Sequence, residues 1–369
     1  EVYNEQKLAT ISTLMQQTNY ITEAQSPQTL FRKDSTILYL YPKKVNSNYF
    51  DGVLGFGTDD NGDFRLNGNV QLSLNNVFNS LEEIRLNWIG TANKNTSLNI
   101  GVKVPYLFKS AIGSETNFKL FKQDSVFVNL DFSERLFYQL NLNSNIGVSG
   151  IIQSSNFLLE DDSYLKSSYD DYSKIGFGLN YHYFLKHHFR LMEGKSMLNI
   201  AVNSIRKKEK NFSWTEDLEN KTVNQVEVGL KTFRLFELSK KHFLKAGAEF
   251  RGLLTKDDDF SENELYRIGG FGSFRGFNEE SITANMYGFL SADYRFVPSE
   301  AFYIGLFADY GFIDNKRANL NTSLLSLGTG ISFLTKMGIF NLSYAVGKTD
   351  ETSFDFKESK IHFGILSQF

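Results

Sequence analysis

The feature that most constrains the fold is a strict alternation of apolar and polar residues. From Phe64 to Leu74, in FRLNGNVQLSL, every even position is apolar or glycine and every odd position is polar. Because successive side chains of a β-strand point to opposite faces, this segment predicts a strand with one dry face and one wet face. The same alternation returns in EIRLNWIG, SLNIGVKV, SVFVNLDF, KIGFGLNYHY, MLNIAVN, VNQVEVGLK, FLKAGAEFRG and GIFNLSYAVGK.

Turn signals between these segments indicate antiparallel neighbours. The Asn61-Gly62 pair inside TDDNGD is the strongest short signal for a hairpin. Between Asn48 and Phe369 we count roughly sixteen strands, an even number typical of closed antiparallel barrels of the outer-membrane type. The predicted fold is therefore all-β, a closed antiparallel transmembrane β-barrel of sixteen strands over residues 47–369.

A soluble β-sandwich would alternate in the same way, but three features favour the membrane barrel. The strands are long, about ten residues each, which suits a tilted membrane crossing. Aromatic residues gather near strand ends, in YLYPKK, NYHYFLKHHF and FYIGLF, where they would form girdles at the two lipid–water interfaces. Mean hydropathy is low, at −0.30, as expected when the wet faces line a lumen.

Residues 1–46 do not follow the barrel pattern. In NEQKLATISTLMQQTNYI, Leu8, Ile11, Leu14 and Met15 share one helical face, and STILYLYPKKV then alternates as a strand. Helix followed by strand predicts the C-terminal part of a small α+β domain. Because the chain begins at Glu1 without a methionine, we expect it to be a mature or trimmed product.

A glycine-rich segment, RIGGFGSFRGF, lies in a predicted loop at about residues 255–284, after about the eleventh strand. At this place the chain resembles the BamA/TamA superfamily of outer-membrane assembly and translocation barrels, whose hallmark is a loop with an R-G-F core. Phe274 stands where the family usually has valine. The resemblance extends to ADYRF and FADYG in the next two strands, to NYFDGVLGFG in the first strand and to VPYLF after the fourth. The resemblance implies that the functional loop contains these residues: Gly269, Gly270, Gly272, Arg275, Gly276 and Phe277.

An arginine enclosed in such a loop needs an acidic partner. Alternation in the two strands after the loop points Asp293 and Asp309 into the barrel. We therefore predict that Arg275 lies in the lumen within salt-bridge reach of Asp309, with Asp293 as the second candidate. The alternative is an external loop with a solvated arginine.

A lateral seam is predicted between the first and last barrel strands. Gly52, Gly55 and Gly57 weaken the first strand and its pairing. The last strand, KIHFGILSQF, contains Gly364 and ends in Phe369, although Ser367 stands where barrel substrates of this machinery usually have an aromatic or aliphatic residue. Such a seam would open and offer its edges to a client strand.

The resemblance implies a bacterial outer-membrane barrel that inserts and assembles outer-membrane proteins. Residues 1–46 would then be the C-terminal part of a periplasmic POTRA-like domain. The implied partners are unfolded outer-membrane protein clients, the lipid bilayer, and periplasmic or lipoprotein accessory subunits. Two alternatives stay open, a polypeptide-secreting pore of the FhaC type and a passive solute porin.

Other functions lack sequence support. No G-x-S-x-G segment is present, and VGKT at residues 346–349 lacks the leading glycine of a phosphate-binding loop. His182, His187 and His188 lack zinc-protease spacing and fit an interfacial aromatic belt better than a metal site. The net charge of −3 argues against nucleic acid, and no cysteine is present. We expect no catalytic residues, no metal and no cofactor.

Overall fold

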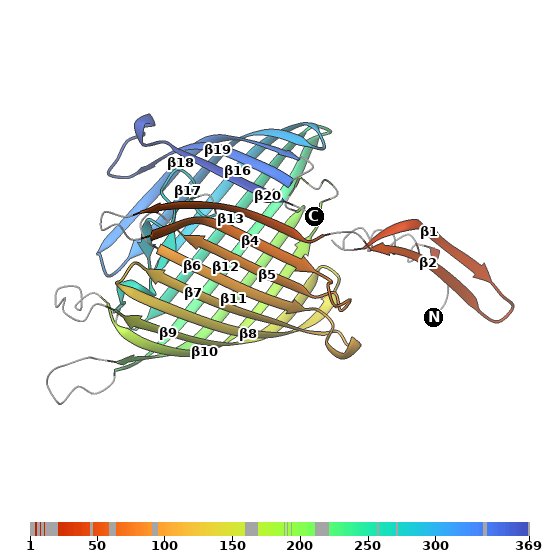
Figure 1. Ribbon diagram of the computed structural model, residues 1–369, viewed down its shortest axis with the longest axis horizontal. Coiled ribbons are helices and arrows are strands. Elements are labelled where there is room, and N and C mark those ends of the chain that lie inside the picture. The colour runs from red at the N-terminus through yellow and green to blue at the C-terminus, as the bar shows by residue number, and fades with distance from the viewer. Residues whose placement is uncertain are drawn as a thin grey trace.

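The computed structural model describes a β-barrel wall with a separate hairpin at one end (Figure 1). It describes residues 4–5, 8, 11, 21–44, 47–58, 64–90, 95–158, 169–187, 189, 191–192, 194–210, 221–256, 258–270, 272–334 and 338–367. No helix within these ranges is long and apolar enough to cross a membrane.

Sixteen strands form one antiparallel sheet, which confirms the predicted all-β antiparallel architecture and the strand number. Neighbours in the chain are neighbours in the sheet throughout, except that β13 pairs with β16 across the long loop. The strands are β3 (Tyr49–Thr58), β4 (Phe64–Asn75), β5 (Glu83–Gly90), β6 (Asn95–Val104), β7 (Ile112–Gln123), β8 (Phe127–Asn141), β9 (Ser144–Phe157), β10 (Asp171–Leu185), β11 (Ser196–Lys210), β12 (Thr222–Ser239), β13 (His242–Thr255), β16 (Met286–Ser299), β17 (Phe302–Asn315), β18 (Leu320–Leu334), β19 (Gly338–Thr349) and β20 (Lys360–Ser367).

The alternation in the sequence becomes the two faces of this wall. In β17, Phe307 and Asp309 point inward and are buried, whereas Leu306 and Tyr310 point outward and are 61% and 55% exposed. Outward apolar residues of the same kind lie all along the wall, as in β10 and β16. An apolar outer face around a polar lumen is the arrangement expected of a membrane barrel.

The sheet is not closed by a ladder of hydrogen bonds. β3 and β20 lie beside each other, but within the described strands no backbone pairing joins them, and they are the two ends of the strand order. The predicted complete closure is therefore not met. Glycines at 52, 55 and 57 give a physical reason, because glycine lowers the stability of a strand and removes side-chain contacts with a neighbouring strand.

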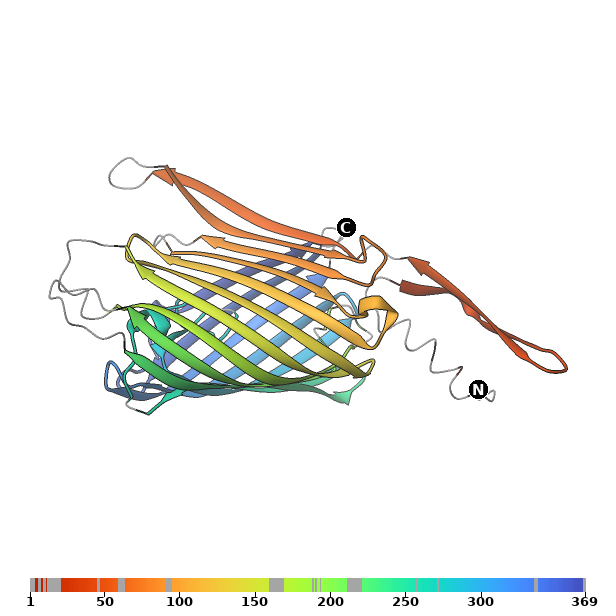
Figure 2. The same ribbon diagram turned by 90° about the horizontal axis from the view of Figure 1, so that it is seen from below.

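A two-stranded sheet precedes the barrel and projects beyond one of its ends (Figures 1 and 2). It consists of β1 (Ile21–Phe31) and β2 (Thr36–Lys44), paired antiparallel. β2 matches the predicted strand, while β1 was not predicted. Of the predicted helix, Leu8 N donates to the Asn4 carbonyl at 3.1 Å, and most of its remaining residues lie outside the described ones. A POTRA-like domain stays a prediction.

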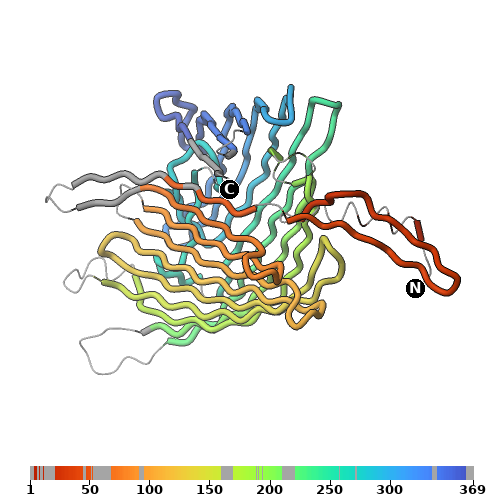
Figure 3. The backbone as a smooth tube through the Cα atoms, turned by 45° about the vertical axis from the view of Figure 1, so that its right-hand side comes forward, coloured from red at the N-terminus to blue at the C-terminus, as the bar shows by residue number. Residues whose placement is uncertain are grey.

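Connections of unequal length distinguish the two ends of the barrel. At the end that carries the β1–β2 hairpin, the described turns include the short 3₁₀ segment η1 (Leu107–Lys109) after the fourth barrel strand. At the opposite end the chain leaves β13 and enters the loop of residues 256–285, which contains η2 (Glu262–Glu264), β14 (Tyr266–Ile268) and β15 (Ile282–Ala284). The tube in Figure 3 shows the tilted strands that surround the lumen.

Candidate functional site: a loop held inside the barrel

The glycine-rich loop is a hairpin whose tip carries the arginine. β14 pairs with β15, so residues 269–281 form the tip between them. β3 to β13 are the first eleven strands of the sheet, which confirms the predicted place of this loop. At its start, Gly269 and Gly270 have φ values of +112° and +91°, which a residue with a side chain adopts only with strain.

Arg275 lies inside the barrel and contacts both predicted carboxylates. Its Nε donates to Asp309 Oδ2 at 2.8 Å and its Nη2 donates to Asp309 Oδ1 at 2.6 Å. The same Nη2 donates to Asp293 Oδ1 at 2.7 Å. The Asp309 side chain is 2% exposed and those of Arg275 and Asp293 are 16% and 14% exposed, so the contact is largely out of water.

The register of the wall explains why these two carboxylates meet one arginine. Asp293 on β16 faces Phe307 on β17, and Asp309 is two residues further along β17, so all three share the inner face. The Arg275 guanidinium lies over the Phe307 ring, 3.6 Å from its centre, which adds a cation–π contact. Arg295 Nη2 donates to the other oxygen of Asp293 at 3.3 Å.

Aromatic residues on either side of Arg275 pack the tip against the wall. Phe274 is 1% exposed and belongs to a buried cluster with Ile313 and Leu324, and Phe277 packs against the same cluster. Phe274 and Phe277 have ring centres 5.6 Å apart. The loop is therefore fixed by apolar contacts as well as by charge.

Gly276 is required by both backbone shape and close approach. Its φ is +84°, and a Cβ atom there would lie 2.9 Å from Gly347 N and 3.0 Å from the Val346 carbonyl carbon. Gly347 on the wall is needed in turn, because a Cβ there would lie 2.6 Å from the Phe277 ring. Gly272 differs, since a Cβ there would meet nothing within 4 Å.

A second contact between the loop and the wall was not predicted from the sequence. Glu264, in η2, lies 2.7 Å from Lys174 Nζ on β10 and 2.8 Å from Lys207 Nζ on β11, and its side chain has no exposed surface. The signal that could have found the turn is S-E-N-E at residues 261–264, because serine followed three residues later by glutamate is a capping box. Both halves of that box form here, with Ser261 and Glu264 as the partners.

The predicted seam residues lie on the two edge strands. Gly52, Gly55 and Gly57 pair with Val70, Asn67 and Arg65 of β4, and Gly364 pairs with Asn341 of β19. Phe369 lies outside the described residues. The structure thus places these glycines at the junction of β3 and β20, and their role in opening stays a prediction.

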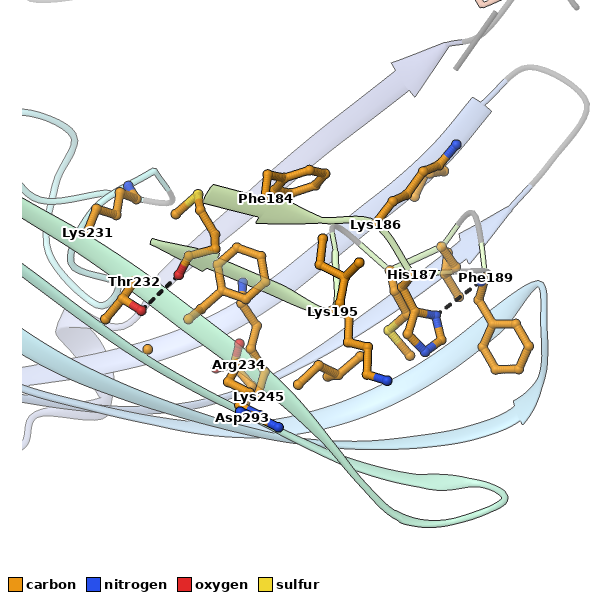
Figure 4. Close-up of a pocket in the computed structure, with 18 of the residues that line it drawn as sticks. Phe184, Lys186, His187, Phe189, Lys195, Lys231, Thr232, Arg234, Lys245 and Asp293 are labelled. Atoms are coloured by element: carbon orange, nitrogen blue, oxygen red, sulfur yellow. Dashed lines mark hydrogen bonds between the residues drawn. The ribbon is translucent and has the colours of Figure 1, made fainter. Parts of the chain in front are cut away.

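The lumen contains a cavity of about 2020 Å³ on the side of the loop tip that faces the β1–β2 hairpin end (Figure 4). His182 and His187 line it, so their assignment to an interfacial belt was wrong. His182 points inward because the even-numbered residues of β10 face the lumen. His187 comes after the end of β10, in a turn that folds into the lumen, and its ring contacts those of Phe189 and Phe243. His188 lies outside the described residues. Within the described ranges no three metal-ligating side chains come together.

Comparisons with known proteins agree with this architecture. Residues 220–369 match the Omp85 superfamily domain. These residues include the loop, both carboxylates of the Arg275 contact and the last strand. No curated protein sequence matches the chain significantly.

Solved structures with the same fold share little sequence with the chain. The structure of BamA from Haemophilus ducreyi lacking POTRA domains 1–3 has a TM-score of 0.59 at 15% identity, covering 97% of this chain and 77% of that one. CdiB from Acinetobacter baumannii has a TM-score of 0.61 at 16% identity, with 100% and 69% covered. CdiB from Escherichia coli has a TM-score of 0.60 at 14% identity, with 100% and 72% covered. Residues 220–369 thus match the Omp85 superfamily domain, and the sixteen-stranded sheet has the same fold as the BamA and CdiB barrels.

Proposed function

We propose that this protein inserts and assembles β-barrel proteins in the bacterial outer membrane through the seam between β3 and β20. The observation that carries the proposal is the pair of unjoined edges, because β3 and β20 lie side by side without a ladder within the described strands. A client strand can hydrogen-bond to such an edge and so enter the membrane as part of a growing sheet.

The loop inside the lumen supports insertion at the seam. Residues 256–285 contact the inner wall through Glu264, Arg275 and Phe277, so the lumen is obstructed while the edges of the wall are unpaired. A passive solute porin is disfavoured by the same contacts. The proposed partners are unfolded outer-membrane protein clients, the lipid bilayer and accessory subunits, with the β1–β2 hairpin on the periplasmic side. We also propose that the protein is not an enzyme.

A polypeptide-secreting pore is the second candidate. It is favoured by the cavity of about 2020 Å³ below the loop tip, which would hold an extended chain if the loop moved. The two functions differ in their route, since insertion uses the seam and secretion uses the lumen.

A disulfide lock tests the route. Leu54→Cys with Ile365→Cys places one thiol on each edge strand and on the same face of the wall, by the registers of β3 with β4 and of β20 with β19, in a chain that has no cysteine of its own. A matched control, Thr329→Cys with Tyr344→Cys, joins β18 to β19, which are already paired. Each variant is reconstituted in liposomes, and an unfolded client barrel is added under oxidising and reducing conditions.

Insertion at the seam predicts that oxidation of the seam pair stops client assembly, measured as a heat-modifiable folded band, and that reduction restores it. The control pair should assemble the client under both conditions. Full assembly with the seam locked would refute the insertion route, and client protected inside the vesicles with the seam locked would identify secretion.

A further inference from the structure

Two lysines on the inner wall are built to hold an anion. Lys174 on β10 and Lys207 on β11 are directly opposite each other in the ladder. Their side chains are 4% and 1% exposed. Like charges opposite each other destabilise a sheet, and a buried ammonium group needs a charged or hydrogen-bonding partner.

Glu264 supplies that anion from the loop. One carboxylate oxygen lies 2.7 Å from Lys174 Nζ and the other 2.8 Å from Lys207 Nζ. The carboxylate also accepts a hydrogen bond from Gln225 Nε2 at 3.2 Å, and Lys207 has a second partner in Glu209 at 3.0 Å. Two lysines and two glutamates therefore contact one another, and the loop contributes one of the two carboxylates that pair with the lysines.

The turn that carries Glu264 is fixed by further contacts with the wall. The Asn263 carbonyl accepts hydrogen bonds from Asn129 Nδ2 at 2.6 Å and from the Tyr172 hydroxyl at 3.2 Å. Asn263 Nδ2 donates to Ser155 Oγ at 2.6 Å. These partners lie on β8, β10 and β9, so this half of the loop is attached to a different part of the wall from Arg275.

The two attachments lie on either side of the strand from which the loop begins. Glu264 forms its ion pairs with β10 and β11, whereas Arg275 forms its ion pairs with β16 and β17, and only β12 and β13 lie between these two pairs of strands in the sheet. Between the attachments, the Tyr266 hydroxyl donates to Glu227 on β12 at 2.8 Å. The loop thus crosses the lumen as a strap with two charged ends.

We propose that Glu264, held between Lys174 and Lys207, is a second positioning residue of the loop, which keeps the strap across the lumen and brings Arg275 to Asp309. Releasing either end then opens the lumen only in part, and releasing both opens it fully. The proposed function gives the strap its biological use, but the strap can be tested without any client.

The test measures loop release in the whole barrel reconstituted in a bilayer. Ala284, in β15, is fully buried, so Ala284→Cys in this cysteine-free chain reacts with a maleimide only when the loop moves. Ion conductance across a planar bilayer measures the opening of the lumen. Glu264→Gln is compared with Glu262→Gln, a matched control in the same turn.

We expect Glu264→Gln to raise the labelling rate by about tenfold or more, because it leaves two buried lysines facing each other. Conductance should rise in Glu264→Gln, rise further when Arg275→Ala is added, and stay unchanged in Glu262→Gln. Lys207→Glu with Glu264→Lys restores an opposite-charge pair and should bring labelling back toward the original rate.

Equal labelling and conductance in Glu264→Gln and Glu262→Gln, with both barrels folded by heat-modifiable mobility, would overturn the proposal. If Glu264→Gln does not fold, the conductance of the unaltered barrel at two pH values provides the test. The conductance at pH 3 must exceed that at pH 7, because at pH 3 Glu264 binds a proton more readily in the released loop than in the docked loop, which weakens docking; equal conductance would overturn the proposal. Neither readout depends on client assembly, so the proposed function can fail while the strap stands.

Discussion

Arg275 meets Asp309 through two parallel hydrogen bonds of 2.8 and 2.6 Å, and this contact joins a loop to a strand thirty-four positions further along the chain. A guanidinium and a carboxylate match in this two-pronged geometry, which a lysine cannot reproduce. Asp293 adds a third hydrogen bond at 2.7 Å. One arginine therefore satisfies two inward carboxylates on neighbouring strands.

The first prediction concerns the energy of that contact. Arg275→Ala leaves Asp309 buried and unpaired, and breaking one partner of a buried pair costs about 3 to 5 kcal/mol. Asp309→Asn should release the loop to a similar degree, while the sixteen-stranded wall stays folded. Limited proteolysis of the loop, fitted as a docking free energy, measures each single variant and the double variant.

The double-mutant cycle provides the control. Coupled residues should give a double variant little worse than either single one. Arg275→Lys keeps the charge but loses the two-pronged geometry, so it should recover only part of the docking. Strictly additive single effects would mean that Arg275 and Asp309 do not hold the loop together.

The second prediction separates the glycines of the tip. Gly276→Ala introduces a Cβ 2.9 Å from Gly347 N at a φ of +84°, so the tip must move away from the wall. The strain of such a residue costs about 1 to 3 kcal/mol. Gly272→Ala is the matched control, because a Cβ there meets nothing within 4 Å. Protease sensitivity of the loop should increase for Gly276→Ala alone, and equal sensitivity in both variants would contradict the observed packing of Gly276.

The part of this site that could be predicted from sequence is the part with local periodicity. Alternation of period two placed Asp293 and Asp309 inward without knowledge of the fold, and the enclosed Arg275 then needed a partner. Glu264 could not be found in this way, because no local pattern tells which part of the wall a loop will contact. Lys174 and Lys207 are separated by the whole of a hairpin, and only the ladder places them opposite each other.

The predictions for His187, for β1 and for closure of the sheet were wrong for a related reason, because a local sequence pattern does not determine these features. His187 was assigned to an outer belt because it lies in an aromatic-rich segment, but the turn after β10 folds into the lumen and takes His187 with it. β1 was missed because ITEAQSPQTLF lacks clear alternation and contains a proline, which is unfavourable within a strand. Closure of the sheet depends on two edges that are far apart in the chain, so no local pattern reports it.

The third prediction follows from the pKa of Glu264. Burial would raise this pKa, but Lys174 and Lys207 lower it from 4.5 to about 2. A lowered pKa means that the docked loop binds the proton less readily than the released loop. The stabilisation is therefore complete above about pH 4.5 and is lost as the pH falls toward 2, by on the order of 3 kcal/mol in total.

Acid should release the η2 end of the loop over this pH range. Protease sensitivity near residue 264, measured from pH 5 to pH 2.5 with an acid-stable protease, should rise in the unaltered barrel. Glu264→Gln should be sensitive already at pH 5 and show no further step. A sensitivity that stays flat in the unaltered barrel would mean that the lysines do not stabilise the Glu264 carboxylate.

The fourth prediction concerns a carboxylate on the outer face of the wall. Glu134 is in the middle of β8, between the outward Phe132 and Leu136, which are 42% and 49% exposed. Its two oxygens accept hydrogen bonds from Ser114 Oγ and Thr116 Oγ1 on β7, each at 2.5 Å. In the proposed membrane location this side chain faces lipid, where a carboxylate is unfavourable.

Glu134→Leu should therefore leave the barrel as stable or stabilise it by on the order of 1 kcal/mol, because it removes a polar group from the lipid-facing surface while Ser114 and Thr116 can turn their hydroxyls to backbone carbonyls. Glu134→Gln, which keeps the shape and loses the charge, is the control, and its stability should lie between that of the unaltered barrel and that of Glu134→Leu.

Urea unfolding of the barrel in lipid vesicles measures the stability, and client assembly is measured on the same samples. A loss of stability in Glu134→Leu would show that the hydrogen bonds to Ser114 and Thr116 outweigh the cost of the carboxylate. A barrel that becomes more stable and yet stops assembling clients would instead mark Glu134 as a contact for another membrane-embedded chain, since an ionisable residue is retained on a lipid-facing wall at a cost only when something uses it.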